Sequence, residues 1–218
     1  MINQNQTIKA ILPRFGQIYH LILASNQVLP LPLALITKLH LSVGQNLSGE
    51  DYEKLSQQSF RFLLRESALR SIGISPQNET SLWRKLTIKS RLIQNKYKFP
   101  NLNLSSEIDH LLTKLAEQKL LSASSYAKHL VQKNSKRSLS YINQLLHHQG
   151  LSQQEIYSTL KTVSVSQETD NLKKLLFKKL PRFQKLPKLK QKEKLLGLAY
   201  RNGFPLTLAK KIVDEILN

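Results

Sequence analysis

Two short segments of the sequence combine residue types that can bind metals. Glu107 and His110 have the spacing found in carboxylate-bridged di-iron sites, and His147 and His148 place two imidazoles near the end of a predicted helix. A di-iron site needs a second such motif and two more glutamates, which the sequence lacks, and no third ligand lies close to His148. We therefore interpret the first segment as a polar helix face, and the histidines as residues suited to a helix C-terminus.

The motifs that enzymes use for nucleophilic, hydrolytic or nucleotide-dependent chemistry are also missing. There is no cysteine, and hence no disulfide, zinc thiolate site or cysteine nucleophile. No glycine-rich phosphate loop, HExxH helix or GxSxG turn occurs either. The sequence therefore predicts a protein that is not an enzyme, with no catalytic residue, cofactor or metal.

A strong excess of positive charge suggests binding chemistry instead. The 218 residues include 33 basic and 14 acidic side chains, a formal net charge of +19. Such a charge attracts polyanions and gives non-specific affinity for nucleic acids. A membrane surface or an acidic protein would also fit the charge.

The basic residues are densest between Lys173 and Lys194, where ten stand against one acid, Glu193. Like charges one helical turn apart destabilise a helix, so we interpret this run as a surface for a polyanion. We expect contacts to phosphates or acidic side chains that fix position without reading sequence. The predicted binding residues are Lys133, Lys136, Arg137, Lys173, Lys174, Lys178, Lys179, Arg182, Lys185, Lys188, Lys190, Lys192, Lys194 and Arg201.

Short amphipathic helices must position these cations. Residues 122–163 contain three apolar stripes at helical spacing, around Ala127, Ile142 and Ile156. Ser122 and Ser138 are suited to N-caps, Ser152 forms a capping box with Glu155, and Gly150 is suited to a left-handed helix end. Helices this short are marginal alone, which predicts a three-helix module that buries the stripes together.

The module recurs along the chain. Residues 201–205 resemble residues 148–152 at a separation of 53 positions, and residues 99–100 give a fainter third echo. Repeats of this size predict a mainly α-helical, elongated array of stacked three-helix units. We place an N-terminal extension at 1–48 and three repeats at 49–121, 122–164 and 165–218, with an insertion in the first.

The N-terminal part differs from the repeats. Residues 8–12 alternate in polarity and residues 18–23 form an apolar run, which predicts two short strands with a turn at Arg14-Phe15-Gly16. Pro32 is suited to the first turn of a following helix. In the helix predicted over residues 79–95, the apolar side should hold Leu82, Leu86, Leu92 and Ile93. No signal peptide or membrane-spanning run is present, so we expect a soluble, cytoplasmic protein.

Several segments resemble the RecX family of recombinase regulators. They are residues 120–127, residues 142–151 and Arg201-Asn202-Gly203-Phe204, which matches the Arg-x-Gly-Phe turn of the family's last repeat. Residues 81–86 are similar to a Glu-Leu-x-x-Lys-Leu segment of its first repeat. Residues 18–55, especially 39–47, resemble the β-containing extension of some members. The chain departs from the family at Ser122 and Ala123, where acidic residues are usual, and in a longer stretch between Lys89 and Ile108.

The resemblance implies tandem three-helix repeats and a function without catalysis. A RecX-like protein would bind a RecA recombinase filament on single-stranded DNA, as a monomer, and mainly inhibit its recombinase, ATPase and coprotease activities in DNA repair and the SOS response. Two alternatives remain open on the residues alone. One is a general basic helical protein that binds nucleic acid without a recombinase, for which exposed aromatic residues beside the lysines would be expected. Phe177 and Phe183 fit core positions equally well. The other is a scaffold for an acidic protein.

Overall fold

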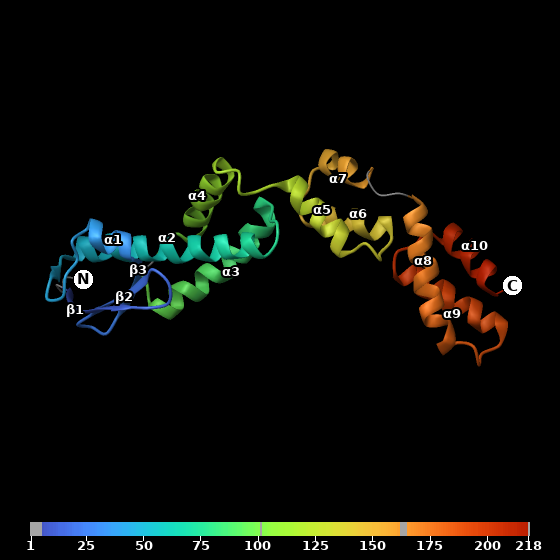
Figure 1. Ribbon diagram of the computed structural model, residues 1–218, viewed down its shortest axis with the longest axis horizontal. Coiled ribbons are helices and arrows are strands. Elements are labelled where there is room, and N and C mark those ends of the chain that lie inside the picture. The colour runs from blue at the N-terminus through green and yellow to red at the C-terminus, as the bar shows by residue number, and fades with distance from the viewer. Residues whose placement is uncertain (1–5, 101, 162–164, 218) are drawn as a thin grey trace. The chain divides into compact units, whose positions relative to one another are not determined.

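The computed structural model describes residues 6–100, 102–161 and 165–217, which form two compact units (Figure 1). The first unit comprises the described residues up to Ile74 together with Ser81–Leu121. The second comprises Ser75–Thr80 together with the described residues from Ser122 onward. The chain is mainly α-helical with a small antiparallel sheet near its N-terminus, which confirms the predicted fold class.

The sheet has the strand order β3-β2-β1-β4 and is antiparallel throughout. Its strands are β1 (Gln6–Pro13), β2 (Ile18–Leu23), β3 (Val28–Pro32) and β4 (Asn46–Leu47), and helix α1 (Leu33–Lys38) follows β3. Strands β1 and β2 and the turn between them were predicted, whereas β3 and β4 were not. Pro30 and Pro32 are compatible with β3 because it is an edge strand, where a missing N–H removes no ladder bond.

Three helices complete the first unit: α2 (Gly49–Ile74), α3 (Glu79–Tyr97) and α4 (Leu104–Glu117). The inner face of the sheet packs with Phe60 and Leu64 of α2 in one core (Figure 1). The Ser59 hydroxyl donates to the Pro30 carbonyl at 2.6 Å, which ties α2 to the free edge of β3.

The apolar side of α3 differs from the prediction at one position. Leu82, Leu86 and Ile93 are buried, and the residue that continues their stripe is Ser90, whose side chain is fully buried. Leu92 follows Ser90 by two positions, which is about 200° around a helix, and it is 57% exposed. The prediction that Leu92 lies on the core side is therefore wrong.

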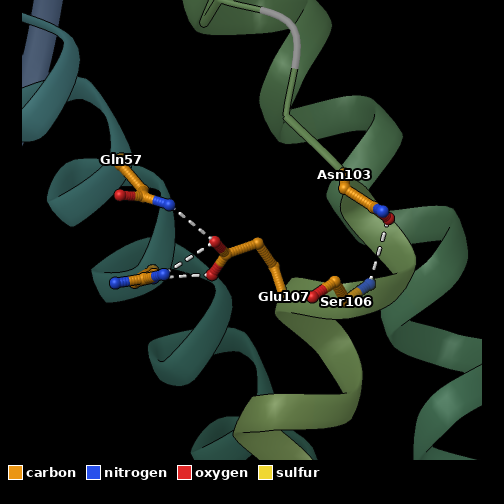
Figure 2. Close-up of polar contacts among 5 residues, drawn as sticks. Gln57, Asn103, Ser106 and Glu107 are labelled. Atoms are coloured by element: carbon orange, nitrogen blue, oxygen red, sulfur yellow. Dashed lines mark hydrogen bonds and ion pairs between the residues drawn. The ribbon is translucent and has the colours of Figure 1, made fainter.

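The interpretation of the Glu107 segment as a polar helix face is wrong for Glu107 itself. Its side chain is only 9% exposed, and its carboxylate accepts two hydrogen bonds from Arg61, at 2.6 and 2.9 Å. Figure 2 shows the Gln57 amide donating to the same carboxylate, at 2.9 Å, while Asn103 caps the start of α4. This charge-assisted, two-point contact joins α4 to α2.

The pKa of Glu107 makes that contact testable. Burial by itself raises the pKa, but the hydrogen bonds from Arg61 and Gln57 and the charge of Arg61 hold it below its ordinary value. A carboxyl group with a lowered folded-state pKa stabilises the fold above its unfolded-state pKa, and the stabilisation disappears as the pH falls through the folded-state pKa. We expect Glu107→Gln to reduce the free energy of unfolding by about 1 kcal/mol at neutral pH. Urea denaturation at neutral and strongly acidic pH measures this, and an equal loss at both would contradict it.

The second unit contains six α-helices and one short 3-10 helix among its described residues. They are α5 (Ala123–Lys133), α6 (Leu139–His148), α7 (Gln153–Leu160), α8 (Val165–Lys179), η1 (Leu180–Arg182), α9 (Lys188–Arg201) and α10 (Leu206–Leu217). Helices α5 to α7 share one core, built around Ala127, Ile142 and Leu146, and α8 to α10 share another, built around Leu172, Leu176 and Leu195. Because both cores lie in one compact unit, the repeat boundaries at 122–164 and 165–218 stay predictions.

The predicted helix ends of the second unit are confirmed. Ser122 and Ser138 accept a backbone N–H at the starts of α5 and α6, and Ser152 with Glu155 forms the capping box of α7. Gly150 ends α6 with φ +76°, and Gly203 ends α9 with φ +79°. In each case the glycine N–H and the N–H after it bond back to the last helical turn, as in a Schellman motif.

Both glycines also lie against the start of another helix. A Cβ added to Gly150 would lie 2.8 Å from the Thr80 hydroxyl at the start of α3, and one added to Gly203 would lie 2.7 Å from the Ser138 hydroxyl that caps α6. The residue before each glycine is also hydrogen-bonded to the segment that precedes the other helix. The Asn78 amide donates to the carbonyl of Gln149 at 2.9 Å, and Arg137 donates to the side chain of Asn202 at 2.8 Å. We call the contacts around Gly203 the α6–α9 joint.

Replacing Gly150 tests the importance of this close approach. We expect Gly150→Ala to destabilise the second unit by about 2 kcal/mol, because alanine is strained at positive φ and its methyl group would meet Thr80. Gly73→Ala is the matched control, since Gly73 lies in α2 with open space around it, and there alanine should stabilise by up to about 1 kcal/mol. Thermal melting followed by circular dichroism distinguishes the two. Equal melting temperatures for both variants would show that the approach is easily relaxed.

Candidate polyanion-binding surface

The ten predicted cations between Lys173 and Lys194 lie on α8, η1 and α9 and on the segment that connects them. Seven of them are exposed, and Lys173, Lys179 and Lys192 are half-buried. The buried side of α8 explains why two of its lysines are exposed. Leu172 and Leu176 face the core, so Lys174 and Lys178, two positions after each of them, lie on the outer side.

Helix α10 supplies carboxylates to two of the half-buried cations. Lys173 pairs with Glu215 at 2.9 Å, and Lys192 pairs with Asp214 at 2.6 Å. All four side chains keep about 41–49% of their surface exposed, so each pair stabilises the fold only slightly. Both lysines are already partly neutralised and offer less to an external anion. In the described part of the chain, the other eight cations have no ion-pair partner.

An aromatic ring accompanies the outer lysines of α8. Phe177 is 55% exposed, and Lys174 and Lys178 lie three positions before it and one after it. Phe183, in contrast, packs against the core of α8 to α10. An exposed ring between lysines can stack on a nucleobase while the ammonium groups contact phosphates.

The α6–α9 joint brings together two predicted arginines that lie far apart in the sequence. Tyr141, Tyr200 and Arg201 line a cleft of about 390 Å³ there. The Arg137 guanidinium lies 5.0 Å from the centre of the Tyr141 ring, a cation–π distance, and Tyr200 is 74% exposed. We call Arg137, Tyr141, Tyr200 and Arg201 the joint cluster. Its arginines were predicted from the sequence, whereas its tyrosines were not, although Tyr200 directly precedes Arg201.

Lys133 and Lys136 are exposed at the end of α5 and just after it. Neither lines the cleft of the joint cluster. Their role in binding a polyanion therefore stays a prediction.

The structure gives little support for other kinds of site. Among the residues it describes, no group of three or more metal-ligating side chains is suitably placed to hold an ion. In the same residues no helix has the length and apolar character needed to cross a membrane.

The fold resembles solved structures at low sequence identity. No family model matches the sequence, and no curated protein matches it either. A crystal structure of regulatory protein RecX superposes on 96% of this chain and 99% of its own, with a TM-score of 0.59 and 17% identity. The chain has the RecX fold. RecX from Lactobacillus salivarius covers 72% of this chain and 96% of its own, with a TM-score of 0.55 and 15% identity.

Within this RecX fold, the ion pairs to α10 divide the lysines into two groups that binding should distinguish. Neutralising a lysine that contacts a phosphate should reduce the salt dependence of binding to single-stranded DNA by about 0.7 units in the logarithmic slope. We expect Lys174→Gln with Lys178→Gln to reduce the slope by about 1.4 units. The matched pair Lys173→Gln with Lys192→Gln should change it less, because Glu215 and Asp214 already neutralise those lysines. Titrations of single-stranded DNA at several salt concentrations measure the slopes, and equal slopes would contradict the division.

Proposed function

We propose that this protein binds the filament of a RecA-type recombinase on single-stranded DNA and mainly inhibits its recombinase, ATPase and coprotease activities. It acts as a cytoplasmic monomer in DNA repair and the SOS response and catalyses no reaction itself. The observation that carries the proposal is the fold: nearly the whole chain superposes on a RecX regulatory protein, and nearly the whole of that protein is matched.

The charge distribution supports the same proposal. Eight cations of α8, η1, α9 and the segment between η1 and α9 form no ion pair with a described residue, and they lie on one compact unit together with the joint cluster. A recombinase filament presents phosphates and acidic side chains together, and exposed lysine and arginine side chains contact both. Such contacts depend little on sequence, as a regulator that acts anywhere along a filament requires.

A second candidate function, general binding of single-stranded nucleic acid, gains weight from the exposed rings. Phe177 and Tyr200 are 55% and 74% exposed, and both stand beside cations. Surfaces of this kind bind bare single strands by stacking and charge, without a recombinase. The scaffold for an acidic protein has no comparable observation in its favour, and it predicts binding that survives nuclease treatment.

The stoichiometry of inhibition separates these functions. We would titrate the protein into recombinase assembled on single-stranded DNA and follow strand exchange and ATP turnover. We expect inhibition at amounts too small to coat the DNA, because a regulator acts on the filament. Inhibition only at saturating amounts would instead identify a competitor for phosphates and would contradict the proposal.

Charge reversal then tests the surface. Lys174→Glu with Lys178→Glu should weaken filament binding at least tenfold, since two phosphate contacts become repulsive. Lys210→Glu with Lys211→Glu is the control, because these exposed lysines of α10 lie outside the predicted set and the change in net charge is the same. Filament co-sedimentation measures binding, and circular dichroism checks helical content. Equal weakening by both pairs would show that net charge, not this surface, decides binding.

A further inference from the structure

The first unit carries a basic cleft whose lining residues lie outside the binding residues predicted from the sequence. It lies between α2 and α3, next to β2, and measures about 420 Å³. Lys85, Lys89 and Lys96 line it from one face of α3, where they span about 16 Å along the helix axis. Arg70 adds a fourth cation from α2, and Glu66 is the one carboxylate among the lining residues that the structure describes.

A second cleft continues from the first. It measures about 640 Å³ and lies between the sheet and the end of α3, with Arg14, His20 and Lys98 in its lining. Lys96 and Tyr97 line both clefts, so the two meet there. The described residues that line the second cleft include no carboxylate. We call the two clefts together the α3 track.

We infer that the α3 track binds a single-stranded nucleic acid, separately from the surface of the second unit. The inference does not depend on a recombinase partner, and it adds a nucleic-acid site to a part of the chain that the proposed function leaves unused. It rests on a continuous series of cations over two adjoining clefts, and on the apolar side chains between them.

Leu92 indicates that the bound nucleic acid is single-stranded. It lines the first cleft and is 57% exposed, and it lies on α3 between Lys89 and Lys96. A single strand can place phosphates on the two lysines and a base against Leu92 or the Tyr97 ring. A duplex hides the faces of its bases and would leave Leu92 in water.

An acidic amphipathic helix is the main competing ligand, and it fits only the first cleft. Such a helix buries a continuous apolar stripe in a groove. Among its described lining residues, the second cleft offers only Val28 and Tyr97 as apolar side chains, together with amide side chains such as Asn26 and the cations already named. An extended chain of phosphates with polar base edges matches this lining better.

His20 gives the second cleft a specific spectroscopic reporter. Arg14 Nε donates to His20 Nδ1 at 3.2 Å, so the neutral ring carries its proton on Nε2. Burial, then the charges of Arg14 and Lys96, lower the pKa of His20. Lys98 also faces this cleft. A bound phosphate offsets these positive charges and raises that pKa, so the affinity for nucleic acid should increase by about fivefold when His20 becomes protonated.

The test uses the full chain and a short single-stranded oligodeoxynucleotide of mixed sequence, without recombinase. We expect Lys89→Glu with Lys96→Glu to weaken binding roughly tenfold. The control, Arg91→Glu with Lys114→Glu, changes two exposed cations of the same unit that line neither cleft, and it should weaken binding less than about twofold. Circular dichroism verifies that both variants are folded. In the unchanged protein and in the variant Lys174→Glu with Lys178→Glu, the oligonucleotide should shift the His20 ring resonances.

Four outcomes would overturn the inference. Equal weakening by the two pairs would show that only net charge matters. Equal affinity for a duplex, or competition by polyglutamate as strong as that by the oligonucleotide, would exclude a single-stranded ligand. Unshifted His20 resonances on binding would exclude the second cleft. Because recombinase is absent from the test, none of these outcomes bears on filament inhibition, which can fail or succeed independently.

Discussion

The second unit depends on the close approach at Gly150 and Gly203. Each glycine ends a helix in a left-handed conformation and leaves room for a hydroxyl group at the start of another helix. Both requirements exclude a Cβ, one through backbone strain and the other through space. The same chemistry occurs at two positions 53 residues apart, so one local arrangement places the end of α6 against the start of α3 and the end of α9 against the start of α6.

This constraint also places the functional groups. Arg137 immediately precedes the Ser138 cap and reaches Asn202, 65 positions later, because Gly203 allows α9 to end there. Tyr141 lies one turn into α6, under the Arg137 guanidinium, and Tyr200 and Arg201 occupy the last turn of α9. A cluster of two arginines and two tyrosines is therefore a consequence of how the helices are joined, and a side chain at Gly203 would disturb all four residues.

Local signals in the sequence predicted local structure well. The caps at Ser122, Ser138 and Ser152 and the left-handed Gly150 depend on neighbours within five residues, and all are present. Contacts between distant segments were not predictable in this way. Arg61 bonds to Glu107 across 46 positions. The hydrogen bond from Ser59 to the Pro30 carbonyl involves β3, a strand that was not predicted because it contains two prolines. Exposure was the weakest prediction, because apolar character alone did not distinguish Leu92 or Phe177 from core residues.

The cations between Lys173 and Lys194 fall into two groups: two lysines form ion pairs within the fold, and the others are available for binding. Helix α10 supplies Asp214 and Glu215 to one lysine each on α9 and α8, and this reduces the repulsion that a run of ten cations would otherwise impose. The eight cations of this run that pair with no described carboxylate, and the separate cations of the α3 track, belong to different compact units. Individually, exposed cations bind phosphates weakly and are screened by salt. When two such surfaces on one chain contact the same strand, the second contact is intramolecular, and the combined affinity exceeds that of either surface without any new interaction. On a polymeric ligand, two modest surfaces can therefore give tight binding while each remains weak enough to exchange.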